Sequence, residues 1–233
     1  MSTNLAQQLR EGTTKSHSMA ENVSFVKSFL GGVVDKKSYR RLIANLFFVY
    51  TALEEEIEKN KTHSVLQSIY FPELNRVSSL KQDLEYYYGS NWAEQICPSS
   101  ATKIYVDRIR NISINQPELL IAHAYTRYMG DLSGGQILKR IAQTAMNLSS
   151  NNGTSFYNFQ NIKDDKKFKI IYRHALDHVP IDQMQIEQII AEANIAFNLN
   201  MKVFQELNSN FIKIMGMLLF SAITSLRKKL FNK

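Results

Sequence analysis

The strongest constraint on the fold is the helical spacing of apolar residues, which runs through nearly the whole 233-residue chain. Residues that interrupt helices are scarce, because only nine glycines and four prolines occur. Residues 36–60 run for several turns without either, and Asp35 stands before them as an N-cap candidate. We find no convincing pair of strands, internal repeat or low-complexity tract. The sequence therefore predicts a single all-α domain over residues 1–233, ending in a C-terminal helix from about residue 208.

Local signals place the other elements. A serine at the start and Gly89 beyond the end mark a helix over residues 78–89. Ser100 is a candidate cap for the next helix, and Pro117 suits the first turn of a long one. We expect the remaining helices over residues 117–148, 164–178, 181–207 and 209–230, with a polar loop over residues 147–159.

Two details concern the ends of the chain's long helices. At the acidic end of residues 36–60, Glu55 and Lys59 are spaced to form an i, i+4 ion pair on the surface. The longest apolar run, residues 214–226, is too short to cross a bilayer. We expect a soluble protein without a transmembrane segment, and a packed C-terminal helix is favoured over a membrane-surface anchor.

Charge and cysteine content narrow the class of partner. The formal net charge is +7, which favours an acidic partner such as an anionic ligand, an acidic protein or nucleic acid. Nucleic acid is the weakest of the three, because no arginine-rich arm, zinc-ligand set or nucleic-acid motif is present. The single cysteine excludes an internal disulfide and fits a reducing compartment.

A cluster of glycines inside an otherwise helical segment is the first candidate for function. Gly130, Gly134 and Gly135 account for three of the nine glycines in the chain. Gly130 and Gly134 are four residues apart and share one helix face. A helix face without side chains allows either close packing of another helix or contact with a flat ligand, and spacing alone leaves both open. For Gly135 we expect a role in bending the helix.

Charged residues flank these glycines and recur near the N-terminus. Arg127 and Asp131 are four residues apart and could form a pair beside the bare backbone. Arg10, His17 and Glu21 fall close to one face of an N-terminal helix. Glu21 could accept a hydrogen bond from one imidazole nitrogen of His17 and leave the other free for a metal. An ordinary, partly buried histidine is the alternative.

Other patterns suggest the chemistry of a ligand. Lys169 and Arg173 are spaced to meet two carboxylates. Phe197, Asn200 and Phe204 share one helix face, although such a stripe is usually core. A di-iron site is excluded because none of the five histidines has a glutamate three residues before it. One histidine, a bare backbone, a basic pair and aromatic residues could together hold a flat metal complex that bears carboxylates, such as heme.

At these residues the sequence resembles the heme oxygenases. The resemblance is carried by "AHAYTRYMGDLSGGQILKRIAQ" at residues 122–143 and by "LREGTTKSHSMAENVSFVKSFL" at residues 9–30. Shorter matches occur in "YTALEEEIEKNK", "KFKIIYR" and "EANIAFNLNM". The resemblance covers roughly residues 4–207 and is weakest after residue 208. It implies a helical bundle in which heme lies between a proximal N-terminal helix and a distal helix that glycines bend.

The resemblance also implies a role for each candidate residue. It implies that His17 is the proximal ligand of the heme iron, with Glu21 near it. It implies that Gly130 and Gly134, with Gly135 beside them, belong to the distal helix over the heme. It implies catalytic roles for Asp131, Gly130, Gly134, Arg127 and Tyr50, with Asp131 organising a distal network of water. Residues implied in binding the heme, at its propionates or in its pocket, are Arg10, Lys15, Glu21, Tyr125, Gly135, Lys169, Arg173, Phe197, Asn200 and Phe204.

The activity that the resemblance implies is oxidative cleavage of heme b, which is both substrate and cofactor. One meso carbon, the α carbon by expectation, is attacked with O2 and electrons from reduced ferredoxin, giving biliverdin, CO and Fe2+. A downstream bilin reductase is an expected partner, and the expected location is the plastid stroma or the cytoplasm of a photosynthetic cell. Two alternatives stay open: a heme carrier or sensor on the same fold, and a thiaminase-like enzyme on the same scaffold.

Overall fold

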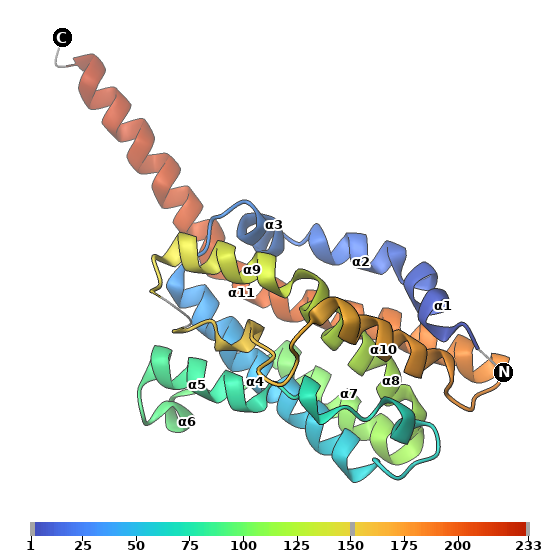
Figure 1. Ribbon diagram of the computed structural model, residues 1–233. Helices are drawn as coiled ribbons and strands as arrows, with labels where there is room; N and C mark the ends of the chain where they lie inside the picture. The colour runs from blue at the N-terminus through green and yellow to red at the C-terminus, as the bar shows by residue number, and fades with distance from the viewer. Residues whose placement is uncertain (1–2, 150–151, 232–233) are drawn as a thin grey trace.

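The computed structural model describes residues 3–149 and 152–231, with side chains described as far as Leu207. Over these residues the chain forms helices and loops without a strand, which confirms the predicted all-α class (Figure 1). The α-helices are α1 (Leu5–Gly12), α2 (Thr14–Glu21), α3 (Ser24–Leu30), α4 (Lys36–Lys59), α5 (Val77–Tyr88), α6 (Trp92–Gln95), α7 (Ser100–Asn115), α8 (Leu120–Ala124), α9 (Gly130–Met146), α10 (Asp165–Asp177) and α11 (Gln183–Phe231). Short 3-10 turns are η1 (Leu66–Ile69), η2 (Pro72–Leu74), η3 (Pro117–Leu119) and η5 (Ser155–Tyr157), and η4 (Tyr125–Met129) is a π-helix.

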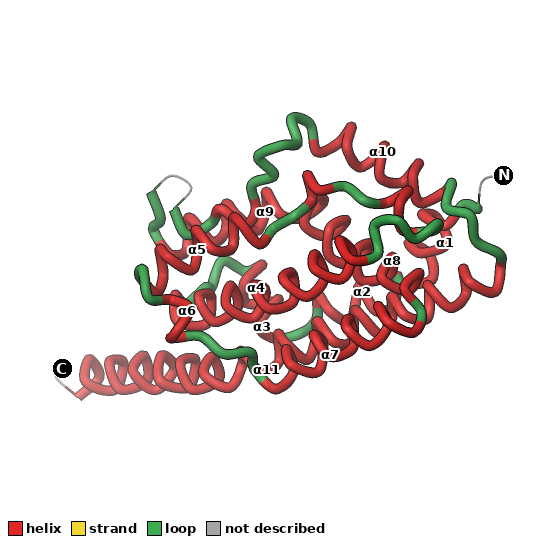
Figure 2. The backbone as a smooth tube through the Cα atoms, turned by 90° about the horizontal axis from the view of Figure 1, so that it is seen from below, coloured by secondary structure: helices red, strands yellow, loops and turns green. Residues whose placement is uncertain are grey.

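Helix α4 is central to the core, where it packs against α5, α7, α8 and α11 (Figure 2). Tyr39, Ile43 and Leu53 of this helix are completely buried. Burying each such side chain stabilises the fold by about 1.5–3 kcal/mol. The predicted N-cap is confirmed, because the Asp35 carboxylate accepts hydrogen bonds from the backbone N–H groups of residues 37 and 38 at 2.9 and 3.0 Å. The core therefore forms around the longest predicted helix.

Two local predictions about helix ends are wrong by one residue. Lys59 pairs with Glu56 at 2.7 Å instead of with Glu55. Glu56 is the partner because its other oxygen accepts a hydrogen bond from the Ser113 hydroxyl at 2.6 Å, which holds the carboxylate between α4 and α7. Ser99, and not Ser100, caps α7 by accepting a 3.3 Å hydrogen bond from the backbone N–H of residue 102.

The long helix predicted over residues 117–148 is divided in the structure. It begins with the 3-10 turn η3, continues as α8, passes through the π-helix η4 and becomes α9. The irregular segment lies just before Gly130, so the glycines do not themselves mark the irregularity. π-helical turns inside α-helices are rare and occur frequently at functional sites.

The N-terminal and C-terminal helices also differ from expectation. Arg10 and His17 lie on two helices, because Thr13 leaves the helical conformation between α1 and α2, with φ −109° and ψ 2°. In contrast, the two helices predicted over residues 181–207 and 209–230 are one continuous α11. The packing of the apolar run 214–226 lies outside the residues whose side chains are described. Among the described residues, no helix combines the length and apolar character needed to cross a membrane.

Candidate functional site

A cavity of about 680 Å³ lies among the helices that carry most of the candidate residues. Volumes of roughly 300–1,000 Å³ are typical of sites for small molecules and cofactors. The residues that line it come from α1 to α3, η4, α9, α10 and α11 and are Arg10, Thr13, Thr14, His17, Glu21, Val26, Leu30, Tyr125, Thr126, Met129, Gly130, Ser133, Gly134, Ile137, Leu138, Arg173 and Phe197. The fold thus brings the N-terminal histidine and the glycine cluster to one space, although more than 100 residues separate them in the chain.

The backbone at Gly130 and Gly134 faces open space in this cavity. Among the described residues, a Cβ atom added at either position would meet no heavy atom within 4 Å outside the local helix. Close packing of another helix is therefore not the reason for these two glycines. Gly135 differs, because it is buried and a Cβ atom there would lie 3.5 Å from the Tyr157 ring, an ordinary contact. Gly135 faces the protein interior and does not line the cavity.

His17 enters the cavity from α2. Its Nδ1 atom lies 3.6 Å from Oε1 of Glu21, one turn further along the helix. Its ring packs against Phe197 of α11 in a T-shaped arrangement, with ring centroids 5.8 Å apart. Within the part of the chain whose side chains are described, Nε2 of His17 has no hydrogen-bond or ion-pair partner. The pairing through Nδ1 therefore leaves Nε2 available as a ligand atom.

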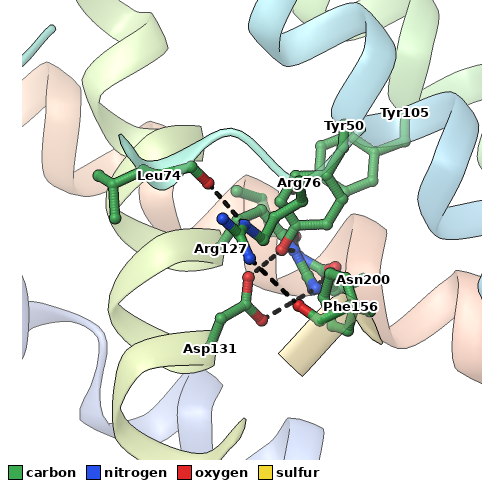
Figure 3. A network of polar contacts seen from close by, with 9 residues as sticks. Tyr50, Leu74, Arg76, Tyr105, Arg127, Asp131, Phe156 and Asn200 are labelled. Atoms are coloured by element: carbon green, nitrogen blue, oxygen red, sulfur yellow. Dashed lines mark hydrogen bonds and ion pairs between the residues drawn. The ribbon is translucent and has the colours of Figure 1, made fainter. Parts of the chain in front are cut away.

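A buried polar network stands behind the glycine helix (Figure 3). The hydroxyl of Tyr50 donates a hydrogen bond to Oδ2 of Asp131 and accepts one from Nε of Arg127 at 3.0 Å. Arg127 Nη2 lies 3.6 Å from Oδ1 of Asp131, which confirms the spacing-based pairing of these two residues. The three side chains come from α4, η4 and α9, so the network ties the central helix to the cavity wall.

The network continues to α11 and α7. Arg127 Nη1 donates to Oδ1 of Asn200 at 2.7 Å, and Nδ2 of Asn200 donates to the Tyr105 hydroxyl at 3.3 Å. Asn200 therefore contacts the polar network and does not line the cavity. Tyr105 was not a candidate from the sequence, because its segment has no motif and its role arises from a partner 95 residues away.

Burial changes the titration of the central groups. Burial raises the pKa of Asp131 above its ordinary value, although the Arg127 charge and the Tyr50 hydrogen bond oppose that rise. Burial also raises the pKa of Tyr50 well above its ordinary value. Tyr50 therefore stays a neutral donor, while Asp131 holds a proton at a higher pH than an exposed aspartate does.

The predicted basic residues divide into two groups. Arg10 and Arg173 line the cavity together with Tyr125, and burial raises the pKa of the Tyr125 hydroxyl despite the opposing charges of Arg173 and Arg10. Lys15 and Lys169 do not line the cavity, and each lies within one turn or so of a residue that does. The structure thus gathers cations on the part of the cavity formed by α1 and α10.

Phe204 lies outside the cavity lining. Its ring stacks on Phe25 of α3, with centroids 6.1 Å apart. The other predicted aromatic residue, Phe197, lines the cavity. The aromatic stripe on α11 therefore serves the core at one position and the cavity at the other.

A clamped loop supports the network, and the sequence did not indicate its members. The Asp83 carboxylate accepts from the backbone N–H groups of residues 155 and 156 at 2.7 and 2.8 Å. The Arg76 guanidinium donates to the Asn158 carbonyl at 2.7 Å and lies 3.7 Å from the centre of the Phe159 ring. Phe156, held by this clamp, packs edge-on against Tyr50. The sequence shows Arg76 and Asp83 only as charged residues. Their burial and the loop that they hold follow from tertiary contacts.

The fold and the cavity define an all-helical protein with a ligand-sized space between its N-terminal helices and a bare helix backbone. A family model described as "Heme oxygenase" matches residues 3–206. The chain is 66% identical to a heme oxygenase of Pyropia yezoensis over 97% of this chain and 94% of that one. It is 59% identical to heme oxygenase 1 of Synechocystis over 98% of this chain and 95% of that one.

A solved structure agrees with these sequence relatives. The crystal structure of heme oxygenase-1 from Synechocystis in complex with heme superposes with a TM-score of 0.92 at 60% identity, covering 95% of this chain and 100% of that one. The chain therefore belongs to the heme oxygenase family.

Proposed function

We propose that this protein is a heme oxygenase that opens the ring of heme b at one meso carbon, consuming O2 and releasing biliverdin, CO and Fe2+. The observation that carries the proposal is the cavity itself, which has the His17 imidazole on its lining together with the bare backbone of Gly130 and Gly134. A flat molecule with a metal at its centre needs both features. The protein must coordinate the metal from one face and leave room for a reactant on the opposite face.

Three further observations fit heme. The cavity volume is in the range of cofactor sites, and its lining includes the apolar side chains of Val26, Met129 and Leu138. Arg10 and Arg173 supply guanidinium groups, which bind carboxylates well. Thr126 also lines the cavity, and its buried hydroxyl has no hydrogen-bond partner among the described residues. A buried hydroxyl without a partner is rare unless a ligand or water completes the site.

The residues around the cavity would divide the work as follows. Heme, when bound, would supply both the iron at which O2 is reduced and the carbon that is oxidised. His17 would bind the iron through Nε2, because Glu21 is placed to hold the proton on Nδ1. Phe197, which packs against the imidazole in a T-shaped arrangement, would limit rotation of that ring.

Asp131 would manage protons at the other side of the site. Its pKa, which burial raises, lets it hold a proton at higher pH than an exposed aspartate does. Tyr50 and Arg127 would fix the orientation of its carboxylate through their contacts with the two oxygens. We propose that water held by Asp131 carries protons into the cavity, while the glycine backbone leaves room beside the substrate.

The choice of meso carbon would follow from the basic residues. Arg10 and Arg173 would bind the propionates, with Lys15 and Lys169 near the rim, and would fix the rotation of the macrocycle in the cavity. The attack would then fall on the same carbon in each turnover, and we propose the α carbon. Tyr125 would contribute a neutral hydroxyl beside these cations.

We propose that reduced ferredoxin supplies the electrons and that the product enters bilin pigment synthesis through a downstream bilin reductase. The support is the net charge of +7 and the gathering of cations near the cavity, since an acidic donor would be steered there. Relatives in red algae and a cyanobacterium support a plastid stroma or the cytoplasm of a photosynthetic cell as the location.

The test is to mix the protein with heme, O2 and reduced ferredoxin and to follow the absorption spectrum. Loss of the heme band together with formation of α-biliverdin is expected. A stable heme complex without product would identify a carrier or sensor instead. A protein that does not bind heme would overturn the whole assignment, and replacing ferredoxin by an artificial reductant separates the activity from the choice of donor.

A further inference from the structure

The helix that carries His17 has little packing of its own. α2 is eight residues long, and none of its residues is buried. The His17 and Glu21 side chains are 60% and 58% exposed, so their mutual contact does not anchor the helix to the core. Isolated helices of this length are unstable in water. The position of α2 must therefore depend on a few contacts with neighbouring elements.

One side chain of α11, that of Asn194, makes three hydrogen bonds, of which one is to α2 and one to the end of α1. Oδ1 of Asn194 accepts a 2.5 Å hydrogen bond from the hydroxyl of Ser16, the residue before His17. Nδ2 of Asn194 donates to the carbonyl of Gly12, the last residue of α1, at 3.1 Å. The same nitrogen donates to the Ile190 carbonyl at 2.9 Å within α11. Both hydrogens of the amide are used, so its orientation is fixed.

Gly12 brings the two chain segments close enough for these bonds. A Cβ atom at Gly12 would lie only 2.6 Å from Cγ2 of Ile190, which is too close unless the Ile190 side chain or one of the two backbones shifts. The end of α1 therefore approaches α11 more closely than a larger residue would allow. Phe197, three residues after Asn194, contacts the His17 ring. α11 thus contacts the segment 12–17 at three residues, which are Gly12, Ser16 and His17.

We propose that Asn194 is a positioning residue for the proximal helix. By binding Ser16 and the Gly12 carbonyl, it fixes the junction of α1 and α2 on α11 and so sets the direction of the His17 imidazole in the cavity. The effect on iron ligation rests on the proposed function, whereas the effect on the position of α2 does not.

The first experiment measures, without heme, how strongly Asn194 stabilises α2. Hydrogen exchange of the backbone amides of residues 14–21 is compared between the wild type, Asn194→Ala and Asn198→Ala. Asn198 is an exposed asparagine on the same helix and serves as the matched control. We expect exchange in α2 to become about tenfold faster in Asn194→Ala, the factor expected when a net hydrogen bond is lost. Unchanged exchange in α2 would overturn the proposal.

Variants of Ser16 test the same contact from the other helix. Ser16→Ala removes only the 2.5 Å bond and is expected to accelerate exchange less than Asn194→Ala does. Ser16→Thr keeps the hydroxyl and should behave as the wild type. In the double variant Ser16→Ala with Asn194→Ala, the two effects should not multiply, because they remove one shared bond. If the two accelerations of exchange multiplied, Ser16 and Asn194 would act independently, which would contradict their shared role in positioning α2.

The second experiment uses the heme-loaded protein. We expect Asn194→Ala to release heme about tenfold faster and to broaden the vibrational band of the iron–imidazole bond, with Asn198→Ala unchanged. If His17→Ala itself leaves that band unchanged, the assignment of His17 as the iron ligand fails. The exchange result still decides whether Asn194 holds α2 in place. If exchange accelerates but the band and the release rate do not change, Asn194 holds α2 without directing the imidazole, and the positioning role is wrong.

Discussion

Tyr50 and Asp131 are 81 residues apart in the chain, yet the tyrosine hydroxyl donates a hydrogen bond directly to the aspartate carboxylate. The bond joins the central helix α4 to the first turn of α9, next to Gly130. Tyr50 is completely buried and therefore cannot exchange this partner for water without local opening. The position of the Asp131 carboxylate beside the cavity is thus set by the core of the protein.

Replacing Tyr50 by phenylalanine should lower turnover and shift its pH dependence. Losing a buried hydrogen bond costs about 1–3 kcal/mol, which corresponds to roughly a 5- to 150-fold loss of rate. The Tyr50 bond lowers the pKa of Asp131, so its removal should keep Asp131 protonated to higher pH. The pH–rate profile of Tyr50→Phe should move upward on the pH axis. Tyr70→Phe, which removes a hydroxyl bonded to surface Glu58, is the control.

Asp131→Ala and Asp131→Asn should separate heme binding from ring opening. The carboxylate does not line the cavity, so heme titration should give an affinity close to that of the wild type. Biliverdin yield should fall by about 10²–10⁴-fold, the usual contribution of a positioned proton donor or acceptor. A normal yield from either variant would rule out the proton role proposed for Asp131.

His17→Ala should remove the iron ligand. Changing a group that only orients a metal ligand typically costs about 10–100-fold, and losing the ligand itself should cost more than 100-fold in turnover. The absorption spectrum of the bound heme should change at the same time. His174→Ala, at an exposed histidine on α10, should leave both properties unchanged. Wild-type turnover in His17→Ala would contradict the assignment.

Adjacent glycines offer a matched comparison. Alanine at either position 134 or position 135 should stabilise the protein without heme by up to about 1 kcal/mol, because alanine favours the helix. At position 134 the new methyl group enters the cavity, so heme affinity and turnover should fall. At position 135 it meets the Tyr157 ring at 3.5 Å, an ordinary contact distance, so both heme affinity and turnover should persist. Equal losses of heme affinity in the two variants would argue against a ligand-facing role for Gly134.

Glu54 should make stability depend on pH. Burial raises its pKa to about 7, although hydrogen bonds from the backbone N–H groups of Arg76 and Val77 oppose the rise. Because the folded-state pKa exceeds the unfolded value of 4.5, the stability that Glu54 contributes is complete below pH 4.5 and is lost as the pH rises through 7. The loss is at most about 3 kcal/mol.

Glu54→Gln should remove this pH dependence while keeping an acceptor for both N–H groups. Chemical denaturation at several pH values between 4.5 and 8 measures the effect as the free energy of unfolding. Glu55→Gln, at the neighbouring exposed position, is the control and should follow the wild type. If Glu54→Gln keeps the full slope, another group is responsible for it.

The sequence predicts features that depend on spacing within one element. The shared face of Gly130 and Gly134 and the pairing of Arg127 with Asp131 follow from the geometry of one helix, and both are present. The network beyond Arg127 could not be predicted in this way. Asn200 and Tyr105 become partners only because α11 and α7 pack together, and helical spacing carries no information about that packing.

Choices between equivalent neighbours also depend on tertiary contacts. Glu55 and Glu56 both lie within reach of Lys59, and the hydrogen bond from Ser113 decides for Glu56. The break between α1 and α2 falls at Thr13, next to the point where Gly12 lies close to the Ile190 side chain of α11. The choice of Glu56 over Glu55 has no signal in the local sequence, because Ser113, 57 residues further along the chain, makes it.

The π-helix η4 gives the chain one residue more than an α-helix would need between α8 and α9. Each residue turns an α-helix by about 100°. A deletion of one residue within 125–129 that restored ordinary α-helix would therefore rotate either α8 or α9 by about that angle. The glycine face and the buried surface of α8 could not both keep their places. The extra residue lets the buried surface of α8 and the glycine face of α9 point in the directions they need along one continuous helical segment. The site depends on that rotation of α9 relative to α8.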